Sequence, residues 1–259
     1  MTLVVRRILA RNPGPFTGPG TNTYLVGDES GFLVLDPGPV DAVHADAIVS
    51  GAGSTPIESV VVTHTHSDHA PLANPLAADL GVPAIGYAPG PSFDPDLVVG
   101  EGDHLDVGES RLSVIHTPGH SDDHVCLLAG TTLFTGDHIM GGSSVMVDDL
   151  APYLRSLERL QRLELDRIHP GHGPDVDEPQ RVISWYLAHR LERERQILEV
   201  LADGRLTVGD IVERLYVDVD ASLYPLAARS VGAHVRKLSD DGVAVVVGDG
   251  WVAEVSLVG

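Results

Sequence analysis

The sequence contains very little cysteine and no long apolar run. Cys126 is the only cysteine among 259 residues, which excludes an internal disulfide framework and a zinc site built from several cysteines. No apolar run approaches the roughly 18–20 residues that a membrane span needs. The first residues contain no continuous apolar region of the signal-peptide type. We therefore expect a cytoplasmic globular protein with no membrane partner, in which Cys126 is part of the core.

Basic residues are scarce as well. Seventeen Lys and Arg residues, of which Lys237 is the only lysine, stand against 37 Asp and Glu residues, so the net charge is −20. Such a charge opposes the long-range attraction of RNA or DNA. Histidine is abundant in contrast, with 13 residues, several of them at short fixed spacings. The histidines are therefore the first candidates for chemistry.

The first two thirds of the chain have the pattern of two sheets with helices outside them, an α+β fold. Short apolar runs separated by turn residues predict hairpins, and apolar residues at helical spacing predict helices. The expected hairpins are 23–26 with 32–35, 105–107 with 111–116, and 125–128 with 132–134, and single strands are expected at 57–62 and 167–169. The expected helices are 41–49 and 149–163.

The last third has a different pattern. A long helix rich in Arg and Glu is expected, followed by two shorter helices and then by two strands across a glycine turn, which is the outline of a winged helix. These elements are expected at 179–202, 208–216, 223–239, 243–247 and 251–255. The predicted domains are a catalytic domain at 1–178, a connecting helix at 179–203 and a winged-helix-like domain at 204–259.

Seven His and Asp residues are candidate metal ligands. Four of them follow the predicted strand 57–62 within six residues, and the other three each follow a later strand, flanked by Gly or Pro. Neutral imidazole and carboxylate are natural ligands of divalent zinc. In chain order they are His64, His66, Asp68, His69, His120, Asp137 and His172.

This ordered ligand series resembles that of the metallo-β-lactamase superfamily. The resemblance implies an αββα sandwich with a two-metal site at one edge. It implies that His64, His66 and His120 hold the first metal, and that Asp68, His69 and His172 hold the second. Asp137 would bridge the two metals.

Further motifs are similar to the β-lactamase-like protein 2 group of that superfamily. They are Asn12 to Phe16, Gly20 to Gly27, Thr117 to His124 and Pro170 to Pro174, and the winged-helix outline also matches. Members of this group include a metal-dependent endoribonuclease acting on single-stranded RNA. Related fungal members are thioesterases acting on acyl carrier proteins. The resemblance thus favours RNA cleavage, whereas the net charge favours a smaller ester or thioester.

The implied chemistry is hydrolysis by a hydroxide that bridges two Zn²⁺ ions, with iron or manganese as alternative metals. Asp68 is the first candidate catalytic residue. His124 and His138 are further candidates, since each lies beside a ligand in the sequence and could contact the substrate or orient that ligand.

Other functions remain open. A thioester hydrolase could resemble either hydroxyacyl-glutathione hydrolases or the acyl-carrier thioesterases, and a single-iron enzyme of the persulfide dioxygenase kind would use similar ligands. A winged-helix regulator is the non-enzyme alternative. Antibiotic hydrolysis is disfavoured, because Asp137 stands where such enzymes commonly have a cysteine. The long helix and small domain suggest a homodimer.

Overall fold

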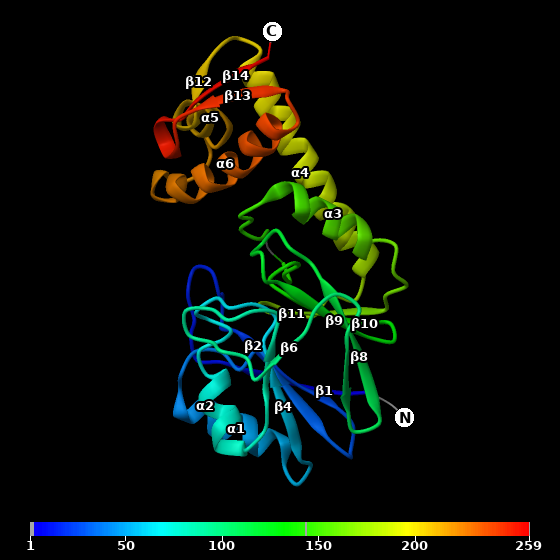
Figure 1. Ribbon diagram of the computed structural model, residues 1–259. Helices are drawn as coiled ribbons and strands as arrows, with labels where there is room; N and C mark the ends of the chain where they lie inside the picture. Colours follow the sequence, from blue (N-terminus) through cyan, green and yellow to red (C-terminus); the bar gives the residue numbers. More distant parts are fainter. Residues whose placement is uncertain (1–2, 143, 259) are drawn as a thin grey trace. The chain divides into compact units, whose positions relative to one another are not determined.

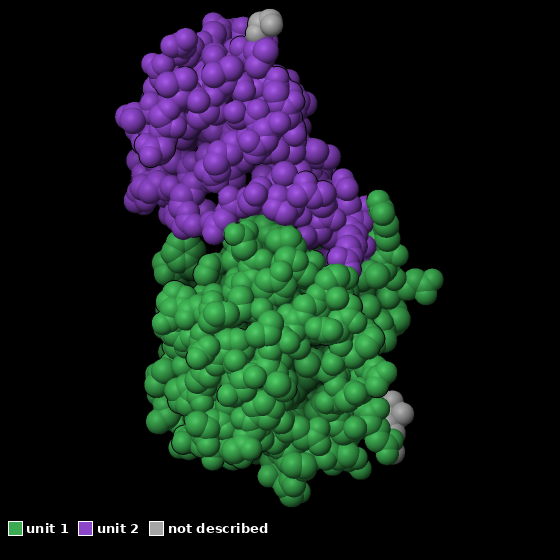
Figure 2. Space-filling model, in the orientation of Figure 1, with its two compact units in different colours: residues 1–145, 162–182 green, residues 146–161, 183–259 purple. Residues whose placement is uncertain are grey.

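The computed structural model describes residues 3–142 and 144–258 (Figure 1). The chain forms two compact units, which are coloured separately in Figure 2. Unit 1 comprises residues 1–145 and 162–182, and unit 2 comprises residues 146–161 and 183–259. The domain boundaries expected from the sequence, at 178 and 203, stay predictions.

The first sheet of unit 1 has six strands in the order β1-β2-β3-β4-β5-β6. Strands β1 to β3 pair antiparallel, and β3 to β6 pair parallel. Their bounds are β1 Val4–Leu9, β2 Asn22–Gly27, β3 Phe32–Leu35, β4 Ile57–Val61, β5 Ala84–Gly86 and β6 Leu97–Val98. Parallel neighbours need crossover connections, and helices α1 (Ala42–Ala52) and α2 (Ala73–Leu80) supply two of them.

Helix α1 begins and ends on clear local signals. The Asp41 carboxylate accepts hydrogen bonds from the backbone N–H groups of Val43 and His44, which caps the first turn. Gly53 ends the helix at a φ of 65°, a conformation that favours glycine. Ile48 is fully buried and packs, with part of helix α2, on the outer face of the first sheet (Figure 1).

The second sheet of unit 1 has five strands in the order β11-β10-β9-β8-β7. The pairs are antiparallel except for β10 with β11. The bounds are β7 His104–Val107, β8 Ser110–His116, β9 Val125–Ala129, β10 Thr132–Gly136 and β11 Arg167–Pro170. Alternate side chains of both sheets, among them Tyr24, Leu33, Leu127 and Phe134, form one core between them. Cys126 is buried, as expected.

Unit 2 contains a helical core and a small sheet. Helices α3 (Leu150–Leu160) and α4 (Pro179–Leu201, of which 183–201 belong to this unit) are followed by a strand–helix–helix–hairpin segment. The sheet order is β12-β14-β13. The remaining elements are β12 Leu206–Thr207, α5 Val208–Leu215, η1 Ala221–Leu223, α6 Tyr224–Asp240, β13 Ala244–Val247, η2 Gly250–Val252 and β14 Glu254–Leu257. Their apolar faces enclose a second core around Ile197, Ile211 and Val231.

Several details differ from the sequence analysis, which did not expect helix α2 or strands β5 and β6. The strand expected at 251–255 is present but lies at Glu254–Leu257, because residues 250–252 form a 3₁₀ turn. Strand β12 was not expected, because its two residues are too few to show the alternation of apolar and polar side chains that indicates a strand. Strand β1 was missed because it is an edge strand with Arg6 and Arg7 in its middle. Among the described residues, no helix combines the length and apolar character that membrane crossing needs.

Candidate metal centre

Loops at one edge of the two sheets of unit 1 carry all seven candidate ligands. The segment from His64 to His69 follows β4, and His120 follows β8. Asp137 follows β10, and His172 follows β11. The chain thus brings residues from four separate segments together, as expected from their positions at strand ends.

The first cluster consists of three histidines. His66 Nδ1 lies 2.9 Å from His64 Nε2 and 2.9 Å from His120 Nε2. One nitrogen of each ring lies within 4.8 Å of the others, close enough to bind one ion. His64 and His120 are buried, whereas His66 is half-buried at the rim.

The second cluster combines two histidines with two carboxylates, Asp68, His69, Asp137 and His172. His172 Nε2 lies 3.2 Å from both His69 Nε2 and Asp68 Oδ2. Asp137 Oδ1 lies 3.3 Å from His69 Nε2, and Asp137 Oδ2 lies 3.7 Å from His120 Nε2 in the first cluster. Asp137 therefore stands between the clusters, where a bridging ligand would lie.

Asp36 orients this site, although sequence analysis did not single it out. One of its carboxylate oxygens accepts the backbone N–H of Thr63 at 2.7 Å. The other accepts the Thr63 hydroxyl at 2.7 Å and His69 Nδ1–H at 2.9 Å. Its backbone φ of 50° is uncommon outside glycine. The signal in the sequence was an acidic residue and Pro-Gly directly after a buried strand.

The hydrogen bonds also determine where the ring protons lie. His69 Nδ1 donates to Asp36, so its Nε2 faces the cluster with a lone pair. His172 Nδ1 donates to the Gly20 carbonyl at 3.3 Å, so in the neutral ring its Nε2 also carries the lone pair. When both rings are neutral, two lone pairs and two carboxylates therefore converge on one point. This donor set fits a divalent cation, and its outer hydrogen bonds are those of typical metal-binding histidines.

His64 has the same arrangement in the first cluster. The Thr63 hydroxyl donates to Asp36 and accepts from His64 Nδ1 at 3.0 Å, so His64 Nε2 faces His66 with a lone pair. Thr63 therefore connects both clusters through Asp36.

The backbone approaches the ligands closely at Gly171. A Cβ atom there would lie 2.7 Å from Asp137 Oδ1 and 2.8 Å from His69 Cε1. Only glycine leaves room for both side chains at this position.

His124 and His138 are both fully buried. His124 Nε2 accepts the backbone N–H of Asp137 at 3.2 Å, and its Nδ1 lies 2.9 Å from the Thr117 hydroxyl. Burial, with a smaller effect of His120, lowers the pKa of His138 to about 3, so this ring is neutral at physiological pH. His124 therefore hydrogen-bonds to the backbone of a candidate ligand, and a direct role of either ring in catalysis stays a prediction.

The side chains of the second cluster shift one another's pKa values. Burial lowers the pKa of His172, but hydrogen bonds to Asp137 and Asp68 outweigh it and raise that pKa to about 9. Burial likewise opposes protonation of His69, yet Asp137 and Asp36 raise its pKa well above the usual value. Burial raises the pKa of Asp137, and the facing His69 and His172 lower it well below its usual range. Without metal, protons therefore compensate the buried carboxylates.

We expect the stabilisation by zinc to grow as the pH rises from about 6.5 to about 9. Folding raises the pKa of His172, so protonation of this ring stabilises the metal-free protein. This stabilisation, up to about 3 kcal/mol, is fully present below about pH 6.5 and is lost as the pH passes about 9. Zinc requires the unprotonated ring, so its binding strengthens over the same window.

Melting temperatures with excess zinc and with chelator would measure this. The difference in melting temperature should widen from about pH 6.5 to about pH 9. In His172→Asn this difference should depend less on pH. A difference independent of pH would contradict the assignment of His172 as a ligand.

Residues 16–172 match the metallo-beta-lactamase superfamily, and residues 207–251 match the beta-lactamase associated winged helix domain. The chain belongs to the metallo-β-lactamase superfamily, whose members are metal-dependent hydrolases. The fold expected from the sequence, including the C-terminal winged helix, is therefore confirmed.

Among its relatives, the chain is similar to "Beta-lactamase-like protein 2 homolog" of Drosophila melanogaster, with 32% identity over 93% of this chain and 90% of the relative. The same name is given to a Caenorhabditis elegans protein, 34% identical over 92% of this chain and 85% of the relative. An "Atrochrysone carboxyl ACP thioesterase" of Aspergillus novofumigatus (strain IBT 16806) is 32% identical over 92% and 79%.

Two solved structures share the whole fold. A metallo-beta-lactamase family protein from Thermus thermophilus covers 98% of both chains, with a TM-score of 0.80 and 19% identity. A beta-lactamase domain protein from Burkholderia ambifaria covers 98% of this chain and 91% of its own, with a TM-score of 0.82 and 24% identity.

Proposed function

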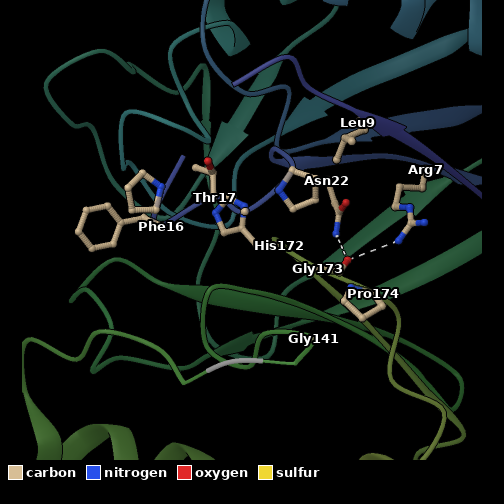
Figure 3. A pocket seen from close by; sticks show the side chains of 12 residues that line it. Arg7, Leu9, Phe16, Thr17, Asn22, Gly141, His172, Gly173 and Pro174 are labelled. Carbon is tan, nitrogen blue, oxygen red and sulfur yellow. Dashed lines mark hydrogen bonds between the residues drawn. The ribbon is translucent and has the colours of Figure 1, made fainter. Parts of the chain in front are cut away.

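We propose that this chain is a two-metal hydrolase of acyl thioesters. Water adds to the thioester carbonyl, the carbon–sulfur bond breaks, and a carboxylic acid and a thiol are released. The observation that carries this proposal is a mainly apolar pocket of about 490 Å³ that borders the metal centre at His172 (Figure 3). Pockets of this size and character suit small organic ligands.

In this proposal each cluster would hold one divalent ion, and Asp137, which stands between the clusters, would serve both. Zinc fits the donor set, and iron or manganese are the alternatives. When bound, such ions lower the pKa of water to about 7 and polarise a carbonyl oxygen.

Asp68 is the most exposed member of the second cluster, with a quarter of its side chain accessible. Burial raises its pKa, but the hydrogen bond from His172 helps lower it below the usual value. Its ionised carboxylate can therefore hold the proton that the attacking water releases. Asp36, Thr63 and His124 keep the ligands in place.

Three observations favour a thioester over RNA as substrate. The net charge of −20 repels a polyanion. The pocket beside His172 has mostly apolar walls, whereas RNA backbones need basic ones. A relative covering most of this chain is named as a thioesterase. Single-stranded RNA remains the second candidate, on the motifs shared with the β-lactamase-like protein 2 group.

The test combines metal analysis with two assays on the full chain. We expect about two zinc ions per chain and turnover of an octanoyl thioester that chelator abolishes and zinc restores. Cleavage of a single-stranded RNA oligonucleotide without thioester turnover would move the protein to the endoribonuclease branch. One iron per chain with neither activity would contradict the two-metal assignment.

A further inference from the structure

Strand β1 directs Arg7 and Leu9 into the pocket beside His172. Side chains alternate along a strand, and Val5 packs against the core between the two sheets, whereas Val4 and Ile8 pack on the outer face of the first sheet. Arg7 and Leu9 are in phase with Val5. They continue its face beyond the core, where both line the pocket.

A loop that precedes β2 provides another wall. Gly14 and Gly18 exchange backbone hydrogen bonds of 3.0 and 2.8 Å, and the Thr17 hydroxyl donates to the Asn12 carbonyl at 2.6 Å. This closed loop holds Phe16 with 54% of its surface exposed. In Figure 3, Arg7 and Leu9 lie on one side of His172 and Phe16 lies on the other.

The loop that carries His172 is tied to the same pocket. Asn22 donates hydrogen bonds of 2.9 Å to the carbonyls of Pro170 and Gly173. Arg7 Nη1 lies 3.4 Å from the same Gly173 carbonyl (Figure 3). These contacts join the loop of His172 to strands β1 and β2, so that His172 and the guanidinium of Arg7 line the same pocket.

Arg7 is the cation of this pocket, in a chain where cations are scarce. Its side chain is 46% exposed and stands 3.8 Å from Asp175, a long contact at an exposed site that contributes little. Asp175 is in turn 3.1 Å from His169 Nδ1. The guanidinium therefore keeps donors for a further anion, and its planar fork matches a carboxylate.

We propose that this pocket binds an acyl chain that ends in a carboxylate, so that the substrate is the thioester of a dicarboxylic acid. The thioester carbonyl lies at the metal centre beside His172. The apolar chain runs along Leu9, and the distal carboxylate pairs with Arg7. Arg7 is a specificity residue here, and the acyl part of the inference rests on the proposed thioesterase function.

Binding of amides, which resist hydrolysis, tests this apart from catalysis. Titration calorimetry on the zinc-loaded full chain would compare monoamides of four-, six- and eight-carbon dicarboxylic acids with plain amides of equal length. At the length that fits, we expect the carboxylate to strengthen binding about tenfold, as a charge-assisted hydrogen-bonded pair does. Arg7→Gln should remove that preference and leave binding of the plain amide unchanged.

Arg6→Gln is the matched control. Arg6 is the neighbour on the same strand, but it lies over the Phe32 ring and donates to the Gly51 carbonyl on the opposite face. The Arg6→Gln variant loses the same charge and should keep the preference for amides that carry a carboxylate. If no chain length shows an Arg7-dependent preference, the inference is wrong. It is equally wrong if adenosine 5′-monophosphate, titrated alongside, binds through Arg7 more tightly than every carboxylate.

Turnover separates this inference from the proposed function. Thioesters of the same acids should show the preference in KM, with kcat little changed by Arg7→Gln. Arg7-dependent binding without hydrolysis of any thioester would uphold the pocket assignment and refute the thioesterase.

Discussion

Replacing Asp68 with asparagine is expected to lower kcat by about 10³-fold or more, the scale of losing a catalytic proton acceptor. The amide cannot hold a proton at neutral pH, and it removes one negative charge from the second cluster. Zinc content should fall from about two ions per chain toward one, because carboxylate is a far better zinc ligand than a neutral amide.

The fold should survive this substitution. The carboxylate of Asp68 contacts His172 and, at 3.8 Å, His69, and both partners belong to the metal centre. Its backbone carbonyl, which accepts the Thr21 hydroxyl, is unchanged. Circular dichroism and the melting temperature of the metal-free protein would establish that the chain is folded.

Asp122→Asn is the matched control for Asp68. Asp122 is an exposed carboxylate in the loop after His120 and lies outside both clusters. The same chemical change there should leave kcat and zinc content as in the wild type. If Asp68→Asn kept turnover within about tenfold of the wild type, Asp68 would have neither of its proposed roles.

Replacing Asp36 with asparagine is expected to keep the fold but disable the second metal site. Asparagine tolerates the φ of 50°, and its carbonyl oxygen can still accept the Thr63 N–H. Its amide N–H, however, faces the ring nitrogen that donates in the wild type. His69 would then carry its proton on Nε2, toward the metal, where it cannot bind.

This change of tautomer should lower zinc affinity of the second site and turnover by about 10- to 100-fold, as loss of an outer-shell partner does. Asp36→Ala should in addition lower the stability of the fold. It leaves the Thr63 N–H, the Thr63 hydroxyl and His69 Nδ1–H buried without an acceptor, at a cost of roughly 1–3 kcal/mol for each group. Zinc titration and urea unfolding of both variants would distinguish lost metal from lost stability.

Asp28→Asn is the control for the loss of a buried carboxylate. Asp28 is 2% exposed and accepts hydrogen bonds from Ser30, Glu109 and Ser110, away from the metal centre. Its variant should keep two zinc ions and full turnover. Equal zinc loss in Asp28→Asn and Asp36→Asn would indicate general destabilisation rather than a change at His69.

Most of the elements, and the gathering of the seven candidate ligands, could be predicted from the sequence alone. Each ligand follows a strand with its own local pattern, so its position at the sheet edge depends on nearby residues. The winged helix was predictable for the same reason, since helix periodicity and a glycine turn are local signals. The seven side chains then meet at one edge because neighbouring strand ends do.

The tertiary structure decided what orients the ligands and what the pocket beside them can accept. Asp36 acts on Thr63 and His69, which lie 27 and 33 positions away, and Arg7 reaches the Gly173 carbonyl 166 positions away. No local periodicity encodes such contacts. They exist because strand β1 pairs with β2, and because β2 holds the loop that carries His172. Side-chain donors and acceptors are matched only when that packing is complete.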